Sequence, residues 1–295
     1  MTARIISGTE IARQITEEVR QEVENLKTRH GITPGLATVL VGADPASQVY
    51  VGAKAKACAN LGIYSERHDL PSNTSEAALL ELVEKLNRDP RIHGILVQSP
   101  PPPHINESKI IFAIDPRKDV DGFHPVSVGR MVIGEPGFLP CTPHGIQVLL
   151  ERSGVNTEGA EVVVVGRSNI VGKPIANIML QKAKGANSTV TICHSATRDM
   201  AGHTRRADII IAAIGKPKFI TADMVKEGVV VIDVGVNEIG KTTEGKRILV
   251  GDVDFDTVKE KAGAITPVPG GVGPMTIVML MSNTVRAARM AAGLD

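Results

Sequence analysis

Tyr50 and Lys54 are four residues apart in the segment after Asp44 and Pro45, which can cap and begin a helix. On a helix, side chains at this spacing lie on one face within reach of each other. Lys56 points toward the opposite side and is expected to be solvated. A lysine can act as a general acid or base where its surroundings ease the loss of its proton. The pair is a candidate for proton transfer, although this spacing also occurs by chance.

Two more polar residues stand where predicted elements end. Gln98 is the last residue of a strand predicted from Ile92, and Asp121 lies in the loop Asp119-Val-Asp-Gly-Phe-His-Pro. Ligands of open α/β sheets bind at the carboxyl ends of strands, which makes Gln98 a candidate for a binding site. Asp121 precedes Gly122, so a role in forming a turn explains it equally well.

A phosphate-binding turn is indicated by Gly166, Ser168 and Gly172, where a run of valines leads into a predicted helix. The free N–H groups and the dipole at a helix N-terminus favour an anion, and small residues leave room for it. The usual Gly-x-Gly-x-x-Gly spacing is not met, because Ser168 replaces the second glycine and Gly172 comes one residue late. The strand-turn-helix context nevertheless predicts a nucleotide site.

The end of the next predicted strand favours NADP over NAD. An NAD site usually has an acid about 20 residues after the turn, where it binds the ribose hydroxyls. The corresponding segment here is Cys193-His-Ser-Ala-Thr, which has no carboxylate, and Arg167 adds a cation beside the turn. A missing acid and an added cation fit a 2′-phosphate, while a solvated surface arginine is the alternative explanation.

A constrained loop precedes the last predicted helix. Six of the eight residues from Pro267 to Pro274 are proline or glycine. Proline fixes φ, and glycine permits positive φ and lets the backbone approach a flat ligand closely. The loop is a candidate for ligand contact, and a rigid turn is the plainer alternative.

The elements that must position these residues follow from the hydrophobic pattern. Helices are predicted over Ile11–Leu26, Pro45–Leu61, Ser75–Leu86, 142–151 and Met275–Ala292, and strands over Leu36–Val41, Ile92–Gln98, Glu161–Val165, Thr189–Cys193, Ile209–Ile214 and Val229–Val234. Apolar strands alternating with helices favour parallel sheets in an α/β fold of two domains. We expect an N-terminal α/β catalytic domain over 1–142 plus 275–295, and a Rossmann-like, doubly wound parallel-sheet cofactor domain over 143–274.

Composition excludes several classes of partner. The 295 residues carry a net charge of +1, with no Trp, two Tyr and five Phe, which disfavours nucleic-acid binding. Cys58, Cys141 and Cys193 form no Cys-x-x-Cys pair, so neither a metal site nor a disulfide framework is expected. The sequence shows no signal peptide and no apolar run approaching ~18 residues, so we expect a cytoplasmic protein without membrane contact.

Six segments, taken together, resemble one enzyme family. In order they are Ser47-Gln-Val-Tyr-Val-Gly-Ala-Lys, Gly94-Ile-Leu-Val-Gln, Lys118-Asp-Val-Asp-Gly-Phe-His-Pro, Cys141-Thr-Pro, Gly166-Arg-Ser-Asn-Ile-Val-Gly-Lys-Pro and Thr266-Pro-Val-Pro-Gly-Gly-Val-Gly-Pro-Met-Thr. Over essentially its whole length the chain resembles the bifunctional methylenetetrahydrofolate dehydrogenase/cyclohydrolase family. Six motifs in order are far more specific than any one of them.

The resemblance implies oxidation of 5,10-methylenetetrahydrofolate by NADP to 5,10-methenyltetrahydrofolate, followed by hydrolysis to 10-formyltetrahydrofolate. It implies that Lys54 is the central catalytic group and that Gln98 hydrogen-bonds it. By the same resemblance Tyr50 shapes the site and stacks near the folate, and Asp121 holds the pterin. The constrained loop, including Pro269, Gly270 and Gly271, would line the folate side.

On the cofactor side the resemblance implies binding by Gly166, Arg167, Ser168, Ser195 and Val236. Members of the family are typically homodimers built through their cofactor domains. Neither a metal nor a nucleic acid takes part in the reaction that the resemblance implies.

The chain departs from the family pattern at two places. Ser99-Pro-Pro-Pro stands where Leu-Pro-Leu-Pro is common, which affects the pocket wall, and Ala196 stands where many members have Lys or Arg, which bears on NADP preference. A monofunctional dehydrogenase and a binding module without turnover are the alternatives, and the presence of Lys54 and Gln98 argues against both. Short-chain dehydrogenases share Tyr-x-x-x-Lys but place it after the glycine turn, whereas here it precedes the turn.

Overall fold

Runs of Val and Ile form a six-stranded parallel sheet in the computed structural model, which describes residues 2–242 and 244–294. The strands, in spatial order, are β1 (Arg4–Ile5), β11 (Ala264–Ile265), β8 (Val230–Asp233), β7 (Ile209–Ala212), β5 (Glu161–Val165) and β6 (Thr189–Cys193). β7 is buried along its whole length, and so is β5 beyond its first residue. Such strands are typical of a doubly wound sheet covered on both faces.

The six-stranded unit comprises the chain up to Arg13 and residues 142–276. Its helices are α6 (Cys141–Arg152), α7 (Gly172–Met179), α8 (Met200–Arg206), the short 3-10 helix η1 (Ala222–Met224) and α9 (Phe255–Val258). An antiparallel hairpin of β9 (Asn237–Lys241) and β10 (Arg247–Val250) comes between β8 and β11 in sequence. The hairpin was not predicted, because β9 has one apolar residue, Ile239, and the apolar run in β10 is only three residues long.

The first residues of the chain differ from the expected domain assignment. The sequence analysis placed residues 1–142 together, but Arg4 and Ile5 pair in register with Ala264 and Ile265 and so belong to the six-stranded sheet. A strand of two residues is too short for a hydrophobic period to reveal it.

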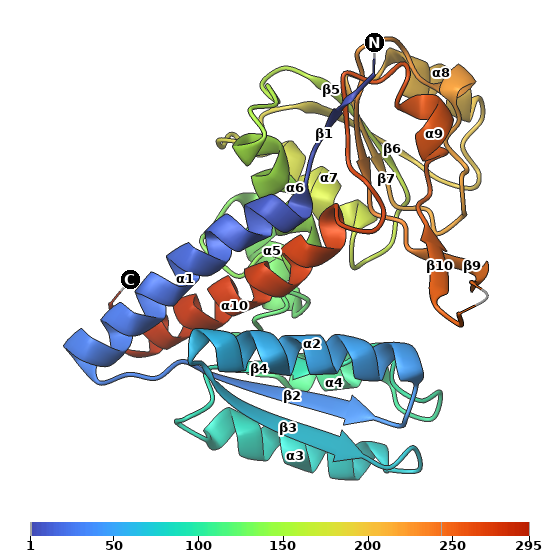
Figure 1. Cartoon of the computed structure of the whole chain (residues 1–295). Helices are drawn as coiled ribbons and strands as arrows, with labels where there is room; N and C mark the ends of the chain where they lie inside the picture. Colours follow the sequence, from blue (N-terminus) through green and yellow to red (C-terminus); the bar gives the residue numbers. More distant parts are fainter. Residues whose placement is uncertain (1, 243, 295) are drawn as a thin grey trace. The chain divides into compact units, whose positions relative to one another are not determined.

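A second unit, from Gln14 to Cys141 and from Ile277 onward, contains a three-stranded parallel sheet in the order β3-β2-β4. Its strands are β2 (Gly35–Val41), β3 (Tyr64–Leu70) and β4 (Gly94–Val97). The helices α2 (Pro45–Leu61) and α3 (Glu76–Arg88) lie on opposite faces of this sheet (Figure 1), and α4 (Glu107–Ala113) and α5 (Pro125–Ile133) follow β4. β3 was not predicted, because this edge strand alternates exposed and half-buried residues, mostly polar.

Local sequence explains where the helices of the three-stranded unit begin and end. The Asp44 carboxylate accepts a hydrogen bond from the Ser47 N–H at 2.8 Å, Pro45 opens α2, and Gly62 ends it in the left-handed conformation at φ 71°. The Ser75 side chain caps α3 in the same way. The helical prediction for the segment with Tyr50 and Lys54 is therefore confirmed.

Two long helices, α1 (Gly8–His30) and α10 (Val272–Ala291), extend from the first unit into the second. Their portions within the three-stranded unit lie side by side (Figure 1), joined by an ion pair between Glu22 and Arg289. Both helices are longer at their N-terminal ends than the sequence analysis predicted.

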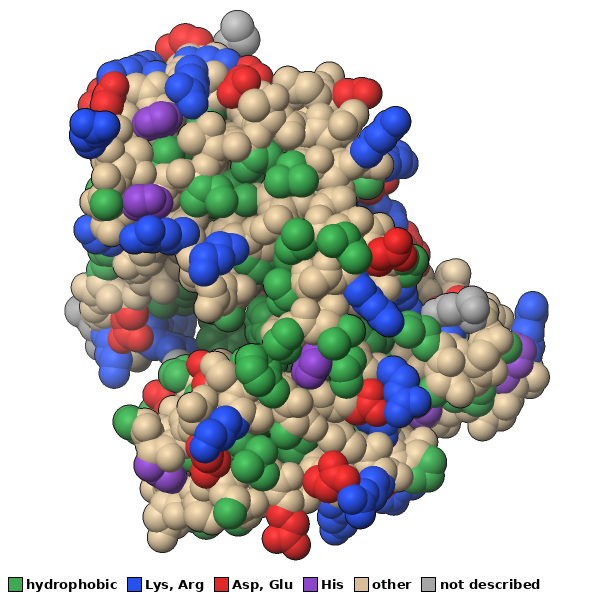
Figure 2. Space-filling view, turned by 180° about the vertical axis from the view of Figure 1, so that it is seen from behind, with side chains coloured by type: hydrophobic (Ala, Val, Ile, Leu, Met, Phe, Trp, Pro, Cys, Tyr) green, Lys and Arg blue, Asp and Glu red, His purple; other side chains and the backbone are tan. Residues whose placement is uncertain are grey.

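The described residues form no helix long and apolar enough to cross a membrane. Figure 2 shows basic and acidic side chains interspersed over the face that it presents, consistent with a net charge of +1.

Candidate functional site

Lys54 and Gln98, far apart in sequence, are hydrogen-bonded to each other. The Lys54 side chain, on α2, is 9% exposed, and its Nζ donates to Gln98 Oε1 at 3.0 Å. Gln98 directly follows β4, where its N–H donates to Val39 O at 2.8 Å. Its Nε2 donates to Ser99 O at 2.8 Å, which orients the amide so that its oxygen faces the lysine. The structure therefore provides the neutral partner that sequence reasoning expected for Lys54.

Tyr50 lies one turn before Lys54 on α2 and is 49% exposed. Its ring is therefore open to contact by a ligand. Lys56 is exposed, as the helical spacing predicted.

Asp121 brings a carboxyl group into the surroundings of Lys54. It is half-buried, and burial raises its pKa above the ordinary value. The positive charge of Lys54 and a hydrogen bond with Cys141 act in the opposite direction. Gln98 is the predicted polar neighbour of Lys54, and it contributes no charge to the site. The structure adds an acid, so the lysine has both a neutral acceptor and an ionisable partner.

The loop that carries Asp121 is held by Asp119, which sequence reasoning did not single out. The buried Asp119 carboxylate accepts hydrogen bonds from Phe123 N (3.2 Å), His124 N (2.9 Å) and Ser127 Oγ (2.6 Å). Burial raises the pKa of Asp119 to about 6. Its place two residues before Asp121 was the only sign in the sequence.

The same loop is also fixed by Asn283, on α10. Its buried Nδ2 donates to Val120 O at 2.8 Å and to Leu139 O at 3.1 Å. Asn283 therefore joins the segments on either side of the Asp121 loop. Nothing in the sequence near Asn283 indicates this contact.

In the six-stranded unit, the predicted phosphate turn follows β5. Gly166 has φ 135°, and a Cβ there would overlap the carbonyl oxygen of Ala213, at the end of the neighbouring strand. Gly172 begins α7, and a Cβ there would overlap Gly166 O. Ser168 Oγ accepts hydrogen bonds from Val171 N (3.1 Å) and Gly172 N (3.3 Å). The turn is therefore compact, and Ser168 holds it against the start of α7.

The other predicted cofactor residues lie at the same edge of the sheet. Ser195 follows β6 and is exposed, Val236 follows β8 and is 52% exposed, and Arg167 is exposed in the turn after β5. All these strands are parallel, so their carboxyl ends meet along one edge. This cradle of glycines with an arginine fits NADP. The absence of a Cβ at Gly166 and Gly172 lets the end of β5, the neighbouring strand end and the start of α7 pack closely, as in a dinucleotide-binding turn. The exposed Arg167 is the candidate for a 2′-phosphate.

The constrained loop follows β11 at this edge. Gly270 has φ 100°, and its carbonyl accepts a hydrogen bond from Thr9 N at 3.0 Å. A Cβ on Gly271 would lie 2.5 Å from Pro267 O, so this position requires glycine. The last three residues of the loop form the first turn of α10, which begins at Val272.

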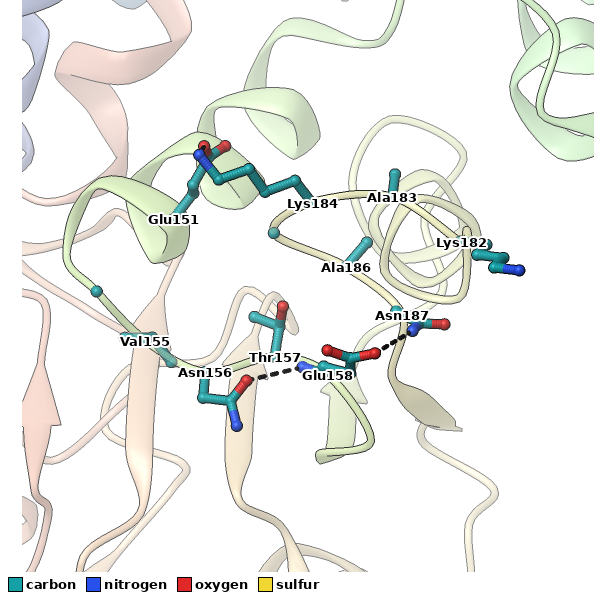
Figure 3. Close-up of a pocket in the computed structure, with 12 residues that line it drawn as sticks. Glu151, Val155, Asn156, Thr157, Glu158, Lys182, Ala183, Lys184, Ala186 and Asn187 are labelled. Atoms are coloured by element: carbon teal, nitrogen blue, oxygen red, sulfur yellow. Dashed lines mark hydrogen bonds and ion pairs between the residues drawn. The ribbon is translucent and has the colours of Figure 1, made fainter.

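A cavity of about 580 Å³ lies at the other edge of the six-stranded sheet, beside the amino ends of β5 and β6 (Figure 3). Lys184 pairs with Glu151 at 2.7 Å, and Asn187 Nδ2 donates to Glu158 Oε1 at 3.1 Å. None of the predicted site residues lines this cavity. It is therefore not part of the candidate site.

Both units match models of one protein family. Residues 140–292 match the model of the NAD(P)-binding domain of tetrahydrofolate dehydrogenase/cyclohydrolase, and residues 6–121 match its catalytic domain. The chain belongs to this family. The "Bifunctional protein FolD" of Dehalococcoides mccartyi (strain CBDB1) is 68% identical over 294 residues, which cover 100% of this chain and 99% of the relative.

Two solved structures of the tetrahydrofolate dehydrogenase/cyclohydrolase family agree with the fold. The bifunctional enzyme FolD of Campylobacter jejuni is 47% identical, with a TM-score of 0.92 and coverage of 98% of this chain and 99% of that chain. The enzyme of Trypanosoma brucei, described as complexed with NADP cofactor and inhibitor, is 39% identical, with a TM-score of 0.93 and coverage of 99% of each chain. The predicted resemblance and the two-domain α/β fold with a Rossmann-like sheet are confirmed.

Proposed function

We propose that this member of the family is bifunctional and uses Lys54 for its hydrolytic step. It oxidises 5,10-methylenetetrahydrofolate to 5,10-methenyltetrahydrofolate with NADP and hydrolyses the product to 10-formyltetrahydrofolate. Family models covering both units and relatives 65–68% identical along the whole chain support the two activities. The observation that carries the hydrolytic assignment is the 3.0 Å contact between the nearly buried Lys54 Nζ and Gln98 Oε1.

Lys54 can move the protons that hydrolysis requires. As a neutral amine it accepts a proton from the water that attacks the methenyl carbon, and as an ammonium it returns a proton to the ring nitrogen that leaves. Gln98, an acceptor without charge, directs Nζ but does not hold it in the ionised form as a carboxylate would. Burial raises the pKa of Asp121. Its carboxyl group can accept a hydrogen bond from the pterin when ionised and donate one when protonated. Tyr50 offers an exposed ring face to the folate.

The turn after β5 would hold NADP by its phosphates. In this proposal the pyrophosphate lies against the turn between Gly166 and the start of α7 at Gly172, with Ser168 in that turn. Arg167 pairs with the 2′-phosphate, and Ser195 and Val236 complete the edge. Bound NADP+ supplies the acceptor for the hydride. The loop with Pro269, Gly270 and Gly271 would contact the folate, and its fixed backbone contributes by orienting the substrate.

We also propose that the chain forms a homodimer through its six-stranded unit and acts in the cytoplasm. β6 is an edge strand of this sheet, and its Ile192 is 40% exposed. An exposed edge can pair with a second copy. Cys58, Cys141 and Cys193 are free and buried, which suits a reducing compartment.

Initial rates with 5,10-methylenetetrahydrofolate test the proposed function. NADP+ and NAD+ are compared in parallel, and formation of reduced cofactor is followed separately from accumulation of the methenyl product. We expect fast reduction of NADP+ without accumulation of methenyl product. Accumulation would indicate a monofunctional dehydrogenase. No reduction of either cofactor would indicate a binding module without turnover.

A further inference from the structure

Two buried carboxylates lie at the edge of the six-stranded sheet where the predicted cofactor residues gather. Asp233 ends β8 and is 3% exposed, and Asp252 follows β10 and is 0% exposed. Neither residue belongs to the set proposed above to touch NADP or folate. Burying a carboxylate is costly unless strong hydrogen bonds compensate, so the partners of these two acids show what they contribute.

Asp252 joins the loops that follow two neighbouring strands. Its Oδ2 accepts hydrogen bonds from Ile214 N at 2.7 Å and Gly215 N at 2.8 Å, in the loop after β7. Its Oδ1 accepts from Asn237 Nδ2 at 2.9 Å, at the start of β9. One side chain therefore sets the separation of the two loops. It also takes up two backbone N–H groups that would otherwise be free at the cofactor edge.

Asp233 in turn holds Asp252. Its Oδ1 accepts from Asp252 N (2.9 Å) and Gly235 N (3.0 Å), and its Oδ2 accepts from Val253 N (3.0 Å). Burial, together with the neighbouring charge of Asp252, raises the pKa of Asp233 to about 7, while the three N–H donors favour the ionised form. Asp233, at the end of β8, therefore fixes the backbone N–H groups of Asp252 and of the residue after it.

Two glycines make room for the two acids. A Cβ on Gly235 would overlap Asp252 Oδ1, and a Cβ on Gly251 would overlap Asp233 Oδ2. Gly235 lies directly before Val236, one of the proposed cofactor contacts. The position of Val236 therefore depends on how closely Asp252 approaches the backbone beside it.

We propose that Asp252, held by Asp233, is a positioning residue for NADP that sets the geometry of the loops after β7 and β8. This inference rests on the proposed function, because it places NADP at this edge of the sheet. Asp252 acts through Gly215, Val236 and Asn237 and does not itself touch the cofactor. The N–H groups of Ile214 and Gly215 donate to Asp252 and so hold the loop after β7 rather than the phosphates.

The test compares Asp252→Asn and Asn237→Ala with Asp208→Asn, which removes the charge of an exposed carboxylate, as a control. Asp208 is also a carboxylate of this sheet that accepts a backbone N–H, from Glu161 at 2.9 Å, and it lies at the opposite edge. The measurements are the Kd of NADP+ by calorimetry, the KM values of NADP+ and of 5,10-methylenetetrahydrofolate, the rate of hydrolysis of added 5,10-methenyltetrahydrofolate, and the melting temperature.

For Asp252→Asn we expect the Kd and KM of NADP+ to rise at least tenfold. The amide NH2 of asparagine would face either the N–H groups of Ile214 and Gly215 or the Nδ2 of Asn237, and a donor cannot accept from a donor. Asn237→Ala removes only the hydrogen bond from Asn237 Nδ2 to Asp252, and we expect the Kd and KM of NADP+ to rise several-fold. The KM of the folate and the rate of hydrolysis should change less than twofold, and Asp208→Asn should leave the Kd of NADP+ unchanged.

An unchanged Kd of NADP+ in Asp252→Asn would overturn the inference. So would equal losses of dehydrogenase and hydrolytic activity together with a lower melting temperature, because they would indicate a structural role only. If Asp252→Asn does not fold, the Kd of NADP+ in Asn237→Ala decides between the same outcomes. A wild-type enzyme that binds NADP+ but does not oxidise the folate would instead count against the proposed function.

Discussion

At the scale of single residues, the environment of Lys54 combines an uncharged acceptor with a nearby acid. The amine is nearly buried and donates to an amide oxygen, and a carboxyl group whose pKa is raised lies near enough to interact with its charge. A fully ionised carboxylate alone would hold the lysine as an ammonium ion. Lys54 therefore has an uncharged hydrogen-bond acceptor and, nearby, an acid whose own pKa burial raises.

Lys54→Met should abolish the hydrolysis of 5,10-methenyltetrahydrofolate, with a loss of at least ~100-fold, because general acid–base catalysis typically contributes that much. Binding of the folate should stay within a few-fold of wild type, since methionine nearly matches the length of lysine. Measured rates and folate affinities check both statements. Lys56→Met, on an exposed lysine of the same helix, is the control. Retained hydrolysis in Lys54→Met would refute the assignment.

Arg167→Ala should weaken NADP+ binding about tenfold or more and change NAD+ kinetics little, because a hydrogen bond to a charged group contributes ~1.5–3 kcal/mol. Each cofactor serves as the control for the other in the same preparation. The measurement is kcat/KM for both cofactors. Equal losses for NADP+ and NAD+ would show that Arg167 does not bind the 2′-phosphate.

At the scale of elements, caps and strand ends bring the reactive side chains into place. Asp44 and Pro45 set the start of α2 and with it the positions of Tyr50 and Lys54, and β4 ends so that Gln98 reaches the lysine. The Asp121 loop has no regular structure of its own. It depends instead on the Asp119 carboxylate and on the Asn283 amide.

Asp119→Asn tests the contribution of this buried acid to stability. The pKa of Asp119 is raised to about 6 from an ordinary 3.8, so its protonated form is favoured by folding. Its contribution to stability is fully present below pH ~4 and is lost as pH rises through ~6. The difference in unfolding free energy between wild type and variant should therefore fall by up to ~3 kcal/mol between these pH values. Urea denaturation at a series of pH values measures it, and a constant difference would contradict the prediction.

At the scale of the whole molecule, chemistry is divided between two units. The three-stranded unit holds Lys54, Gln98 and Asp121, and the six-stranded unit holds the phosphate turn and the constrained loop. The chain passes between the units three times. It does so at residues 13–14 within α1, at 141–142, and at 276–277 within α10. The residues proposed for proton transfer therefore lie in one unit, and the part of the chain that matches the family's NAD(P)-binding domain forms most of the other.

The proposed homodimer can be tested at the edge of the larger sheet. Ile192→Glu places a charge on β6, and like charges facing each other across paired strands should shift the chain from dimer to monomer of 31.2 kDa. Sedimentation velocity of both forms provides the measurement. Ile248→Glu, on the similarly exposed β10, is the control and should stay dimeric. A wild-type chain that sediments as a monomer would refute the proposed dimer.

Much of this protein follows from local pattern. The strand Thr189–Cys193 has the bounds that its apolar run predicts, and the helix with Tyr50 and Lys54 begins at its predicted cap. These features depend on residues close together in sequence, where backbone preference and alternation of apolar side chains suffice. The six motifs also led to the family, because their residue types and order are specific.

Other features required contacts between distant residues. Asn283 holds Val120 across 163 residues, and β1 joins a strand about 260 positions away. Asp252 reaches Ile214 across 38 residues, and the sequence around Asp252 and Asn283 does not indicate these contacts. A buried polar group takes its role from the donors and acceptors that folding brings to it, and these are set by the packing of whole elements. The residues proposed to touch ligand were therefore visible in the sequence, whereas the buried polar residues that hold their loops emerged only from the folded chain.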